Sequence, residues 1–187
     1  MIGKRLIMLQ DVETILFDED VLLKRIKELG EEISKDYAGE EVMLVGILKG
    51  ASVFMSDLIR QITIPAYIDY MVVSSYGNSA ETSGVVRIIK DLEDNIEGKN
   101  IIIVEDIIDT GLTLDYLKKN LLNRNPKSLK ICTLLDKPAR RQKEIEIDYK
   151  GFDVPDEFII GYGIDYAEKY RNLPFVGLLK REVYEKR

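Results

Sequence analysis

The chain has 187 residues, of which 45% are hydrophobic and 32% charged, values typical of a soluble globular protein with one domain. Its formal net charge of −6 disfavours nucleic acid and anionic membranes as partners, and no apolar run approaches the ~18 residues of a membrane span. We therefore expect a single domain, residues 1–187, that binds neither nucleic acid nor membrane.

Histidine is absent, and cysteine occurs once, as Cys132. These counts exclude Ser-His-Asp and Cys-His catalysis, intrachain disulfides and zinc sites that contain histidine. Cys132 stands in a predicted strand and is interpreted as a buried structural thiol. Acid–base chemistry must therefore come from Asp, Glu, Lys or Tyr. A bound metal would be a hard cation on oxygen ligands, and magnesium is the natural candidate beside phosphates.

The N-terminal segment, residues 1–17, has no clear amphipathic face, although a short strand fits residues 6–9. Its basic start leads into only four apolar residues before Gln10, too few for a signal peptide, so we expect a cytoplasmic protein. Asp18 is a candidate N-cap for a helix whose apolar residues recur on one face as far as Ile33.

Two strands with contrasting connections follow this helix. The apolar run at residues 42–48 leads through Lys49-Gly50-Ala51-Ser52 into a second helix, which by itself indicates an ordinary strand-to-helix turn. A strand at residues 66–75, a small polar loop at residues 75–84 and a strand at residues 85–89 form a long hairpin. The loop is interpreted as mobile, and it becomes a candidate lid if a reactive site lies beside it.

Residues 100–114 read N-I-I-I-V-E-D-I-I-D-T-G-L-T-L and combine a strand, an acidic turn and a helix start. The β-branched residues 101–104 suit a strand buried on both faces. Backbone N–H groups at the helix start attract a phosphate; Gly111 permits close approach, and Thr110 and Thr113 add hydroxyl donors. This layout places a ligand at the carboxyl end of a sheet.

Three carboxylates belong to the same stretch: Glu105, Asp106 and Asp109. The adjacent pair, Glu105 and Asp106, accepts hydrogen bonds and suits a vicinal diol such as ribose. Neither the G-x-x-x-x-G-K-[ST] loop nor the G-x-G-x-x-G fingerprint is present. The stretch therefore favours a phosphorylated ribose, and the alternative is a buried strand with an acidic turn and a capped helix.

The C-terminal third carries a strand at residues 128–135 and a closing strand at residues 176–180. The alternation of strands and helices predicts an α/β fold, without an internal repeat or interdomain linker. The remaining candidate residues each have an ordinary interpretation: a solvated charge for Lys137, strand core for Phe158 and Ile159, and a surface ion pair for Asp165 and Arg171.

The wording V-E-D-I-I-D-T-G-L-T-L at residues 104–114 resembles the phosphoribosyl diphosphate (PRPP) motif of type I phosphoribosyltransferases, in the wording of the hypoxanthine-guanine branch. The resemblance covers nearly the whole chain. It implies a parallel core sheet flanked by helices, with a small hood over its carboxyl edge built from the N-terminal segment and roughly residues 150–175. It also implies a purine-salvage enzyme that moves the 5-phosphoribosyl group from PRPP to hypoxanthine or guanine, giving IMP or GMP and diphosphate.

Carried onto this sequence, the motif assigns Glu105 and Asp106 to the ribose hydroxyls. The 5′-phosphate falls to the residues that begin the helix, with Leu112 acting only through its backbone: Asp109, Thr110, Gly111, Leu112 and Thr113. Asp109 would also take the proton from purine nitrogen 7 as nitrogen 9 attacks the sugar.

The L-K-G-A sequence at residues 48–51 looks like the family's first diphosphate loop, although Ala51 stands where Ser or Gly is common. In that loop the peptide between Leu48 and Lys49 is often cis and, with Gly50, exposes backbone amides to the diphosphate. The resemblance adds further diphosphate contacts from the long loop and from the C-terminal region: Ser75, Tyr76 and Arg171.

The resemblance places the purine between three residues. Lys137 would donate to the 6-oxygen, Phe158 would stack on the ring, and the backbone of Ile159 would pair with the base edge. It implies a magnesium cofactor, held by Asp165 through water together with Glu105 and Asp106.

The expected partners are PRPP and a 6-oxopurine, and the family suggests a homodimer or homotetramer. Two alternatives stay open. One is a regulator that keeps the PRPP fold to sense the ligand while it binds nucleic acid. The other is a phosphoribosyltransferase for another base, such as adenine, xanthine or a pyrimidine.

Overall fold

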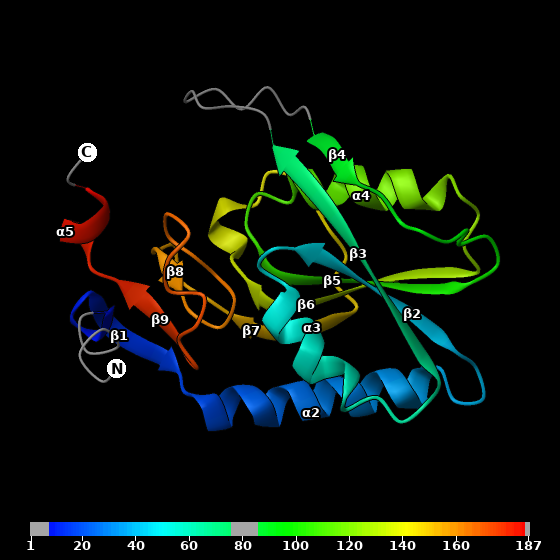
Figure 1. The fold of residues 1–187 in the computed structure, drawn as a ribbon, viewed down its shortest axis with the longest axis horizontal. Helices are drawn as coiled ribbons and strands as arrows, with labels where there is room; N and C mark the ends of the chain where they lie inside the picture. The colour runs from blue at the N-terminus through cyan, green and yellow to red at the C-terminus, as the bar shows by residue number, and fades with distance from the viewer. Residues whose placement is uncertain (1–7, 76–85, 186–187) are drawn as a thin grey trace.

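The computed structural model describes residues 8–75 and 86–185, in which strands and helices alternate for most of the length (Figure 1). The strands are β1 (Val12–Phe17), β2 (Val42–Leu48), β3 (Ala66–Ser75), β4 (Val86–Lys90), β5 (Asn100–Ile108), β6 (Ser128–Asp136), β7 (Tyr149–Asp153), β8 (Ile159–Ile160) and β9 (Val176–Leu179). The helices are α2 (Glu19–Asp36), α3 (Ser52–Ile59), α4 (Leu112–Leu122) and α5 (Arg181–Tyr184), with a 3₁₀ helix η1 (Pro138–Arg140).

The main sheet has six strands in the order β4-β3-β2-β5-β6-β7. All neighbours from β3 to β7 run parallel, and β4 is an antiparallel edge strand on β3. The predicted α/β fold with a parallel core sheet is confirmed. Because parallel strands end at the same edge, the loops after β2, β5 and β6 meet there.

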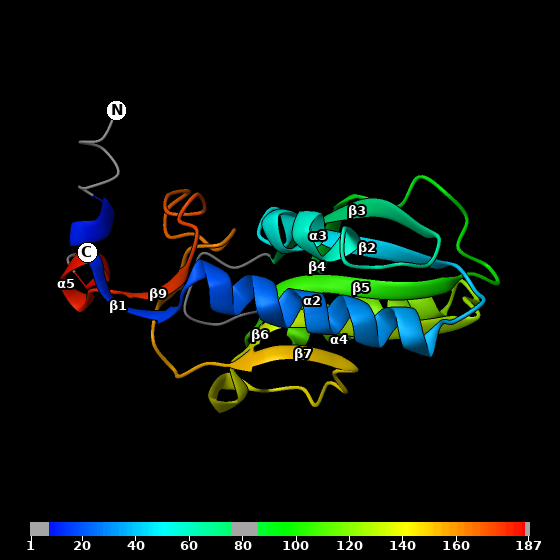
Figure 2. The same ribbon diagram turned by 90° about the horizontal axis from the view of Figure 1, so that it is seen from below.

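The core lies on both faces of this sheet. Helices α2 and α3 pack on one face and α4 on the other (Figures 1 and 2). Alternate residues of β5 serve the two sides: Ile102 and Val104 face α2 and α3, whereas Ile101 and Ile103 face α4. Burial on both sides explains why the apolar run of β5 shows no hydrophobic–polar alternation.

A second, three-stranded antiparallel sheet has the order β1-β9-β8 and lies beyond the carboxyl edge of the main sheet (Figure 1). We call it the hood sheet. It has a small apolar cluster of its own: Ile160, Tyr170, Leu173, Phe175 and Leu179. Strand β7 belongs to the main sheet, so the hood sheet takes its chain from residues 12–17, 159–160 and 176–179.

Several predicted elements differ from the structure. Strands β1 and β7 were not predicted, because each is short and depends on distant partners; the rings of Phe17 and Phe152 stack at 4.1 Å between them. The expected strand at residues 6–9 is wrong where it can be judged, since residues 8–10 are helical. Strand β4 begins at Val86 within the described chain, and the loop at residues 76–85 lies outside it.

Cys132 is fully buried in β6, as expected for a structural thiol, and burial raises its pKa. Among residues 8–75 and 86–185, no helix is both long and apolar enough to cross a membrane.

The predicted N-cap of α2 is present, and it provides a test of the fold. The Asp18 side chain accepts a hydrogen bond from the Val21 amide at 2.9 Å. We expect Asp18→Ala to lower the free energy of unfolding by about 1 kcal/mol, because the amide loses its partner. Urea denaturation measures the change. Asp20→Ala is the control, because it removes a carboxylate from the first turn of α2 and leaves the Asp18 cap in place. It should lower the free energy of unfolding by clearly less than Asp18→Ala.

Candidate functional site

The candidate site is the carboxyl edge of the main sheet, where the loops after β2, β5 and β6 meet the segment that joins β8 to β9. The ladder between β5 and β6 continues to the pair Ile108 and Asp136. The acidic pair therefore lies within β5 itself and not in a turn after it, which corrects the predicted layout. Because strand side chains alternate, Glu105 and Asp106 point to opposite faces.

Asp106 faces the loop after β2. A Cβ atom built on Gly50 would overlap Asp106 Oδ2, so any larger residue at position 50 must displace this carboxylate. A Cβ on Gly163, whose φ of +99° already favours glycine, would overlap the carbonyl oxygen of Gly50. Three segments thus pack closely around Gly50: the loop after β2, the end of β5 and the segment after β8.

The acidic pair is held in a poorly solvated position. Burial, followed by the neighbouring charge of Asp106, raises the pKa of Glu105 well above its ordinary range. Burial raises the pKa of Asp106 to about 6; backbone hydrogen bonds and Arg171 oppose this shift, and Asp165 adds to it. The two carboxylates of Asp106 and Asp165 are therefore close enough to repel each other, and a cation between them would remove that repulsion.

These oxygen donors fit magnesium, which binds through one or two carboxylates and completes its shell with water and phosphate. In the described part of the chain, no three acidic side chains are gathered to hold an ion alone. Glu105, Asp106 and Asp165 would thus hold a magnesium ion only together with oxygens of a phosphorylated ligand.

The loop between β5 and α4 has the geometry of an anion site. Gly111 precedes the helix with φ +79°, and a Cβ there would lie 2.9 Å from the Lys143 carbonyl oxygen. The Thr110 carbonyl accepts the Gln142 and Lys143 amides at 2.9 and 3.1 Å, which fixes the loop. A cavity of about 140 Å³ lies along it and is lined by Glu105, Ile107, Ile108, Asp109, Thr110, Gly111, Thr113 and Leu114.

Asp109 stands at the start of this loop. Within the described residues, its Oδ1 atom is buried and has no hydrogen-bond partner, while Arg140 Nη1 lies 3.8 Å from Oδ2. An unpaired buried acceptor is costly unless a ligand supplies the missing proton. This geometry suits a group that accepts a hydrogen bond or a proton from a bound molecule.

Lys137 is buried at the end of β6 and is not the solvated charge of the ordinary interpretation. Its Nζ donates to the Glu157 carbonyl at 2.9 Å, and its amide donates to the Ile108 carbonyl at 2.9 Å. Burial lowers the pKa of Lys137, and the charge of Asp109 partly opposes this. The structure thus brings Lys137 and Asp109 together, although 27 other residues separate them in the chain.

Phe158 and Ile159, the two neighbouring residues predicted to contact the purine, occupy different environments. The Phe158 ring is 37% exposed and meets Tyr166 edge-on at 5.1 Å and Tyr184 at a tilt at 5.0 Å. Ile159 is buried in β8 opposite Leu178. Phe158 can therefore present ring surface to a ligand, whereas Ile159 can contribute only its backbone.

The loop after β2 carries a cis peptide between Leu48 and Lys49, as the family resemblance implied. Arg171 lies close by, with Nη1 donating to the Gly163 carbonyl at 2.8 Å and Nη2 2.7 Å from Asp165 Oδ1. Ser75 ends β3, and the predicted contact Tyr76 lies outside the described residues, as does the proposed lid.

Sequence reasoning missed three charged residues at this edge. Arg141 pairs with Asp136, Glu157 holds Lys137 through its carbonyl, and Glu168 contacts Lys49 at 3.0 Å. No local pattern marks any of them, because each partner comes from another element or an irregular loop.

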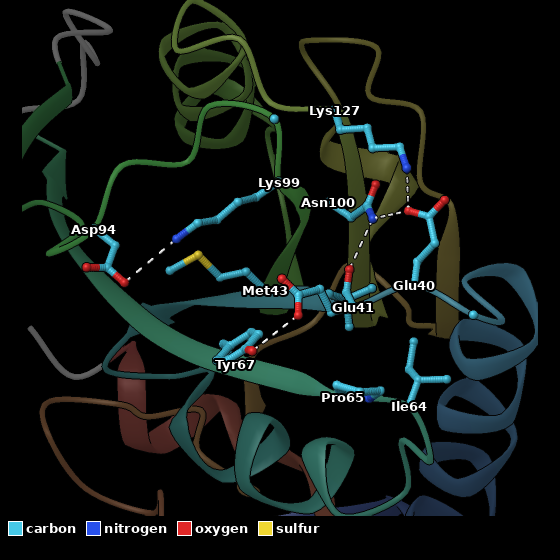
Figure 3. Close-up of a pocket in the computed structure, with 13 residues that line it drawn as sticks. Glu40, Glu41, Met43, Ile64, Pro65, Tyr67, Asp94, Lys99, Asn100 and Lys127 are labelled. Atoms are coloured by element: carbon cyan, nitrogen blue, oxygen red, sulfur yellow. Dashed lines mark hydrogen bonds and ion pairs between the residues drawn. The ribbon is translucent and has the colours of Figure 1, made fainter.

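A cavity of about 900 Å³ lies at the opposite, amino edge of the sheet (Figure 3). Its polar groups are paired with each other: Glu40 accepts from Asn100 and Lys127 at 2.6 Å, and Glu41 accepts from Tyr67 at 3.2 Å. Since its charges are satisfied internally, this cavity lacks the unpaired acceptors of the carboxyl edge.

Comparison with known proteins identifies the family to which the chain belongs. The family model of the phosphoribosyl transferase domain matches residues 14–167. The chain is 52% identical over 178 residues to a hypoxanthine-guanine phosphoribosyltransferase of Bacillus subtilis, covering 95% of this chain and 99% of the relative. A crystal structure of a hypoxanthine phosphoribosyltransferase from Staphylococcus aureus matches with a TM-score of 0.92 at 50% identity, covering 95% of this chain and 97% of that one.

A longer relative is also similar. The chain is 51% identical over 183 residues to the bifunctional protein TilS/HprT of Listeria monocytogenes. That match covers 98% of this chain, which spans 28% of the length of the relative.

The contact between Gly50 and Asp106 generates a prediction. In Gly50→Ala the new methyl group must displace the Asp106 carboxylate, so we expect a large loss of affinity for PRPP in a protein that still folds. Calorimetric titration with PRPP measures the affinity, and thermal melting checks the fold. Gly39→Ala is the control, since nothing lies within 4 Å of a Cβ there. Unchanged PRPP affinity in Gly50→Ala would remove Asp106 from the binding site.

Proposed function

The chain belongs to the phosphoribosyltransferase family, and we propose that it transfers the 5-phosphoribosyl group from PRPP to hypoxanthine or guanine, giving IMP or GMP and diphosphate. One observation carries the proposal. An unpaired buried oxygen of Asp109 and the buried ammonium of Lys137 lie at the same sheet edge, beside the loop suited to a phosphate. An acceptor and a donor placed together suit the nitrogen 7 and the 6-oxygen of one purine.

The purine binds between Lys137 and Phe158. The Lys137 ammonium has three hydrogens, of which one is used by the Glu157 carbonyl, so donors are left for the 6-oxygen. The exposed face of Phe158 stacks on the ring, and the Ile159 backbone pairs with the base edge. Tyr166 and Tyr184 pack against the Phe158 ring and support this orientation.

The phosphorylated sugar binds along the end of β5. Glu105 and Asp106 hold the ribose hydroxyls, and the loop from Asp109 to Thr113 clasps the 5′-phosphate. The left-handed Gly111 lets the backbone amides approach the phosphate, and Leu112 takes part through its backbone only. The hydroxyls of Thr110 and Thr113 add donors.

The diphosphate group binds on the loop Leu48–Lys49–Gly50 and on Arg171, and we assign Ser75 and Tyr76 to it on the family resemblance alone, since Tyr76 lies outside the described residues. Asp165, Glu105 and Asp106 would hold a magnesium ion together with oxygens of PRPP, and a bound ion would supply positive charge to neutralise the leaving diphosphate. We also propose that residues 1–187 act as one domain, with the hood sheet over the reaction site, assembled as a homodimer or homotetramer.

The reaction breaks the bond between ribose carbon 1 and the diphosphate oxygen and forms the bond from carbon 1 to purine nitrogen 9. Positive charge develops on the sugar, as in glycoside cleavage, and Glu105 and Asp106 steady it. Asp109 takes the proton from nitrogen 7 as nitrogen 9 attacks. The diphosphate leaves with the bonding electron pair, so atoms and charges balance. Exclusion of water from the reaction site would protect the activated sugar from hydrolysis.

A spectrophotometric screen with PRPP and magnesium tests the function and its alternatives. We expect turnover with hypoxanthine or guanine, and little with adenine, orotate or uracil. Turnover with another base would leave the PRPP site intact and change only the purine assignment. A filter-binding assay with RNA and DNA tests the alternative that the chain is a PRPP-sensing regulator. Strong nucleic acid binding without turnover of any base would overturn the proposed enzymatic function.

Asp109→Asn tests the base. The amide keeps the shape of the side chain but cannot accept the nitrogen 7 proton, so we expect kcat to fall roughly 10²–10⁴-fold with little change in the KM for PRPP. Steady-state kinetics measure both constants. Asp94→Asn, whose carboxylate is 74% exposed at the amino edge of the sheet, is the control and should behave as the parent. Unchanged turnover would exclude Asp109 as the base.

Lys137→Gln tests recognition of the 6-oxygen. A hydrogen bond to a charged donor contributes about 1.5–3 kcal/mol, so we expect kcat/KM for hypoxanthine to fall roughly 10- to 150-fold. The KM for PRPP should change little. Lys119→Gln removes an exposed charge of α4 and serves as the control. If the ratio of hypoxanthine to adenine turnover stays as in the parent, the Lys137 assignment is wrong.

A further inference from the structure

A carboxylate lies between the ammonium of Lys49 and the guanidinium of Arg171, two cations in the segments that we assign to the diphosphate. Glu168 Oε2 is 3.0 Å from Lys49 Nζ and 3.5 Å from Arg171 Nη2. Lys49 follows β2 in the main sheet, and Arg171 belongs to the segment between β8 and β9. One oxygen of Glu168 therefore joins two cations from separate parts of the fold.

The backbone presents Glu168 to these cations from a tight turn. Tyr166 and Lys169 pair through two backbone hydrogen bonds of 3.2 and 3.0 Å, which leaves only Ala167 and Glu168 between them. Both residues have positive φ, +51° and +62°, the geometry of a two-residue primed turn that usually takes Asn or Gly. The Glu168 amide also donates to Asp165 at 2.8 Å.

Glu168 is an exposed glutamate, which is ionised at neutral pH, and its two neighbours are cations. An ammonium and a guanidinium that share one anionic oxygen make the same contacts with a phosphate oxygen. Within the described chain, Arg171 Nε is buried without a partner, so this guanidinium has a donor to spare.

We propose that Glu168 is an internal competitor of the diphosphate: its carboxylate stands in for a phosphate oxygen between Lys49 and Arg171 and withdraws when the ligand binds. The inference rests on the proposed function, because it needs these two cations to be diphosphate ligands. The side chains of Lys49 and Glu168 are 67% and 65% exposed, so the pair can separate without disturbing the core. The competition weakens the hold on PRPP and on the product diphosphate alike, and so favours product release.

Glu168→Gln tests the proposal, since it keeps the shape and removes the charge. Inorganic diphosphate with magnesium is titrated calorimetrically into the parent and the variant. We expect the dissociation constant to fall roughly three- to tenfold in Glu168→Gln, the size expected for one or two exposed ion pairs. The KM for PRPP should fall in parallel, while the KM for hypoxanthine stays unchanged.

The matched control is Glu31→Gln, which breaks another exposed ion pair, with Lys27 at 3.9 Å on α2, far from the sheet edge. It should leave the dissociation constant of diphosphate at the parent value. Unchanged or weaker diphosphate binding in Glu168→Gln overturns the proposal, and weaker binding would make Glu168 a positioning residue for Lys49 and Arg171. A parent that neither binds diphosphate nor consumes PRPP overturns the proposed function as well. If the parent binds diphosphate and consumes PRPP, but Glu168→Gln leaves the dissociation constant of diphosphate unchanged, only the inference about Glu168 fails.

Discussion

The close packing of three chain segments around Gly50 is the constraint on which the arrangement of side chains at the carboxyl edge depends. A side chain at Gly50 would overlap the Asp106 carboxylate, and one at Gly163 would overlap the Gly50 carbonyl. The two glycines let the end of β5, the loop after β2 and the segment after β8 share one small volume. Without that approach, the acidic pair of β5 would lie too far from Arg171 and Asp165 to act on the same ligand.

The two edges of the main sheet differ in how their charges are satisfied. At the amino edge Glu40 and Glu41 are paired with neighbouring donors, and the large cavity there has no unmet acceptor among its named pairs. At the carboxyl edge, burial raises the pKa values of Glu105 and Asp106. The charge of Asp106 adds to the shift of Glu105, and that of Asp165 adds to the shift of Asp106. Within the described residues, Asp109 keeps a buried oxygen unpaired. Such groups destabilise the folded chain unless a ligand or cation satisfies them, so their concentration at one edge points to binding there.

The sequence predicted much of this site because the key residues stand directly at the ends of predicted strands and helices. Thr110, Gly111 and the helix after them form the predicted strand-to-helix loop, and Asp18 caps its helix as expected. The boundary of β5 was harder to predict, because its pairing with β6 carries the strand past the two carboxylates to Ile108. Pairing between strands extends an element further than its local composition indicates.

By itself, the sequence determined the order of the strands β2 to β6 and the helices α2 to α4, the burial of both faces of β5, and the chemistry available to the site. These properties depend on local runs, turn residues and the absence of histidine. The tertiary structure alone decided that β1 and β7 are strands, that Lys137 is buried on the Glu157 carbonyl, and that Glu168 reaches Lys49. Each of these features is a contact between residues far apart in the chain, and no local pattern encodes such a contact, because its free energy comes from the partner.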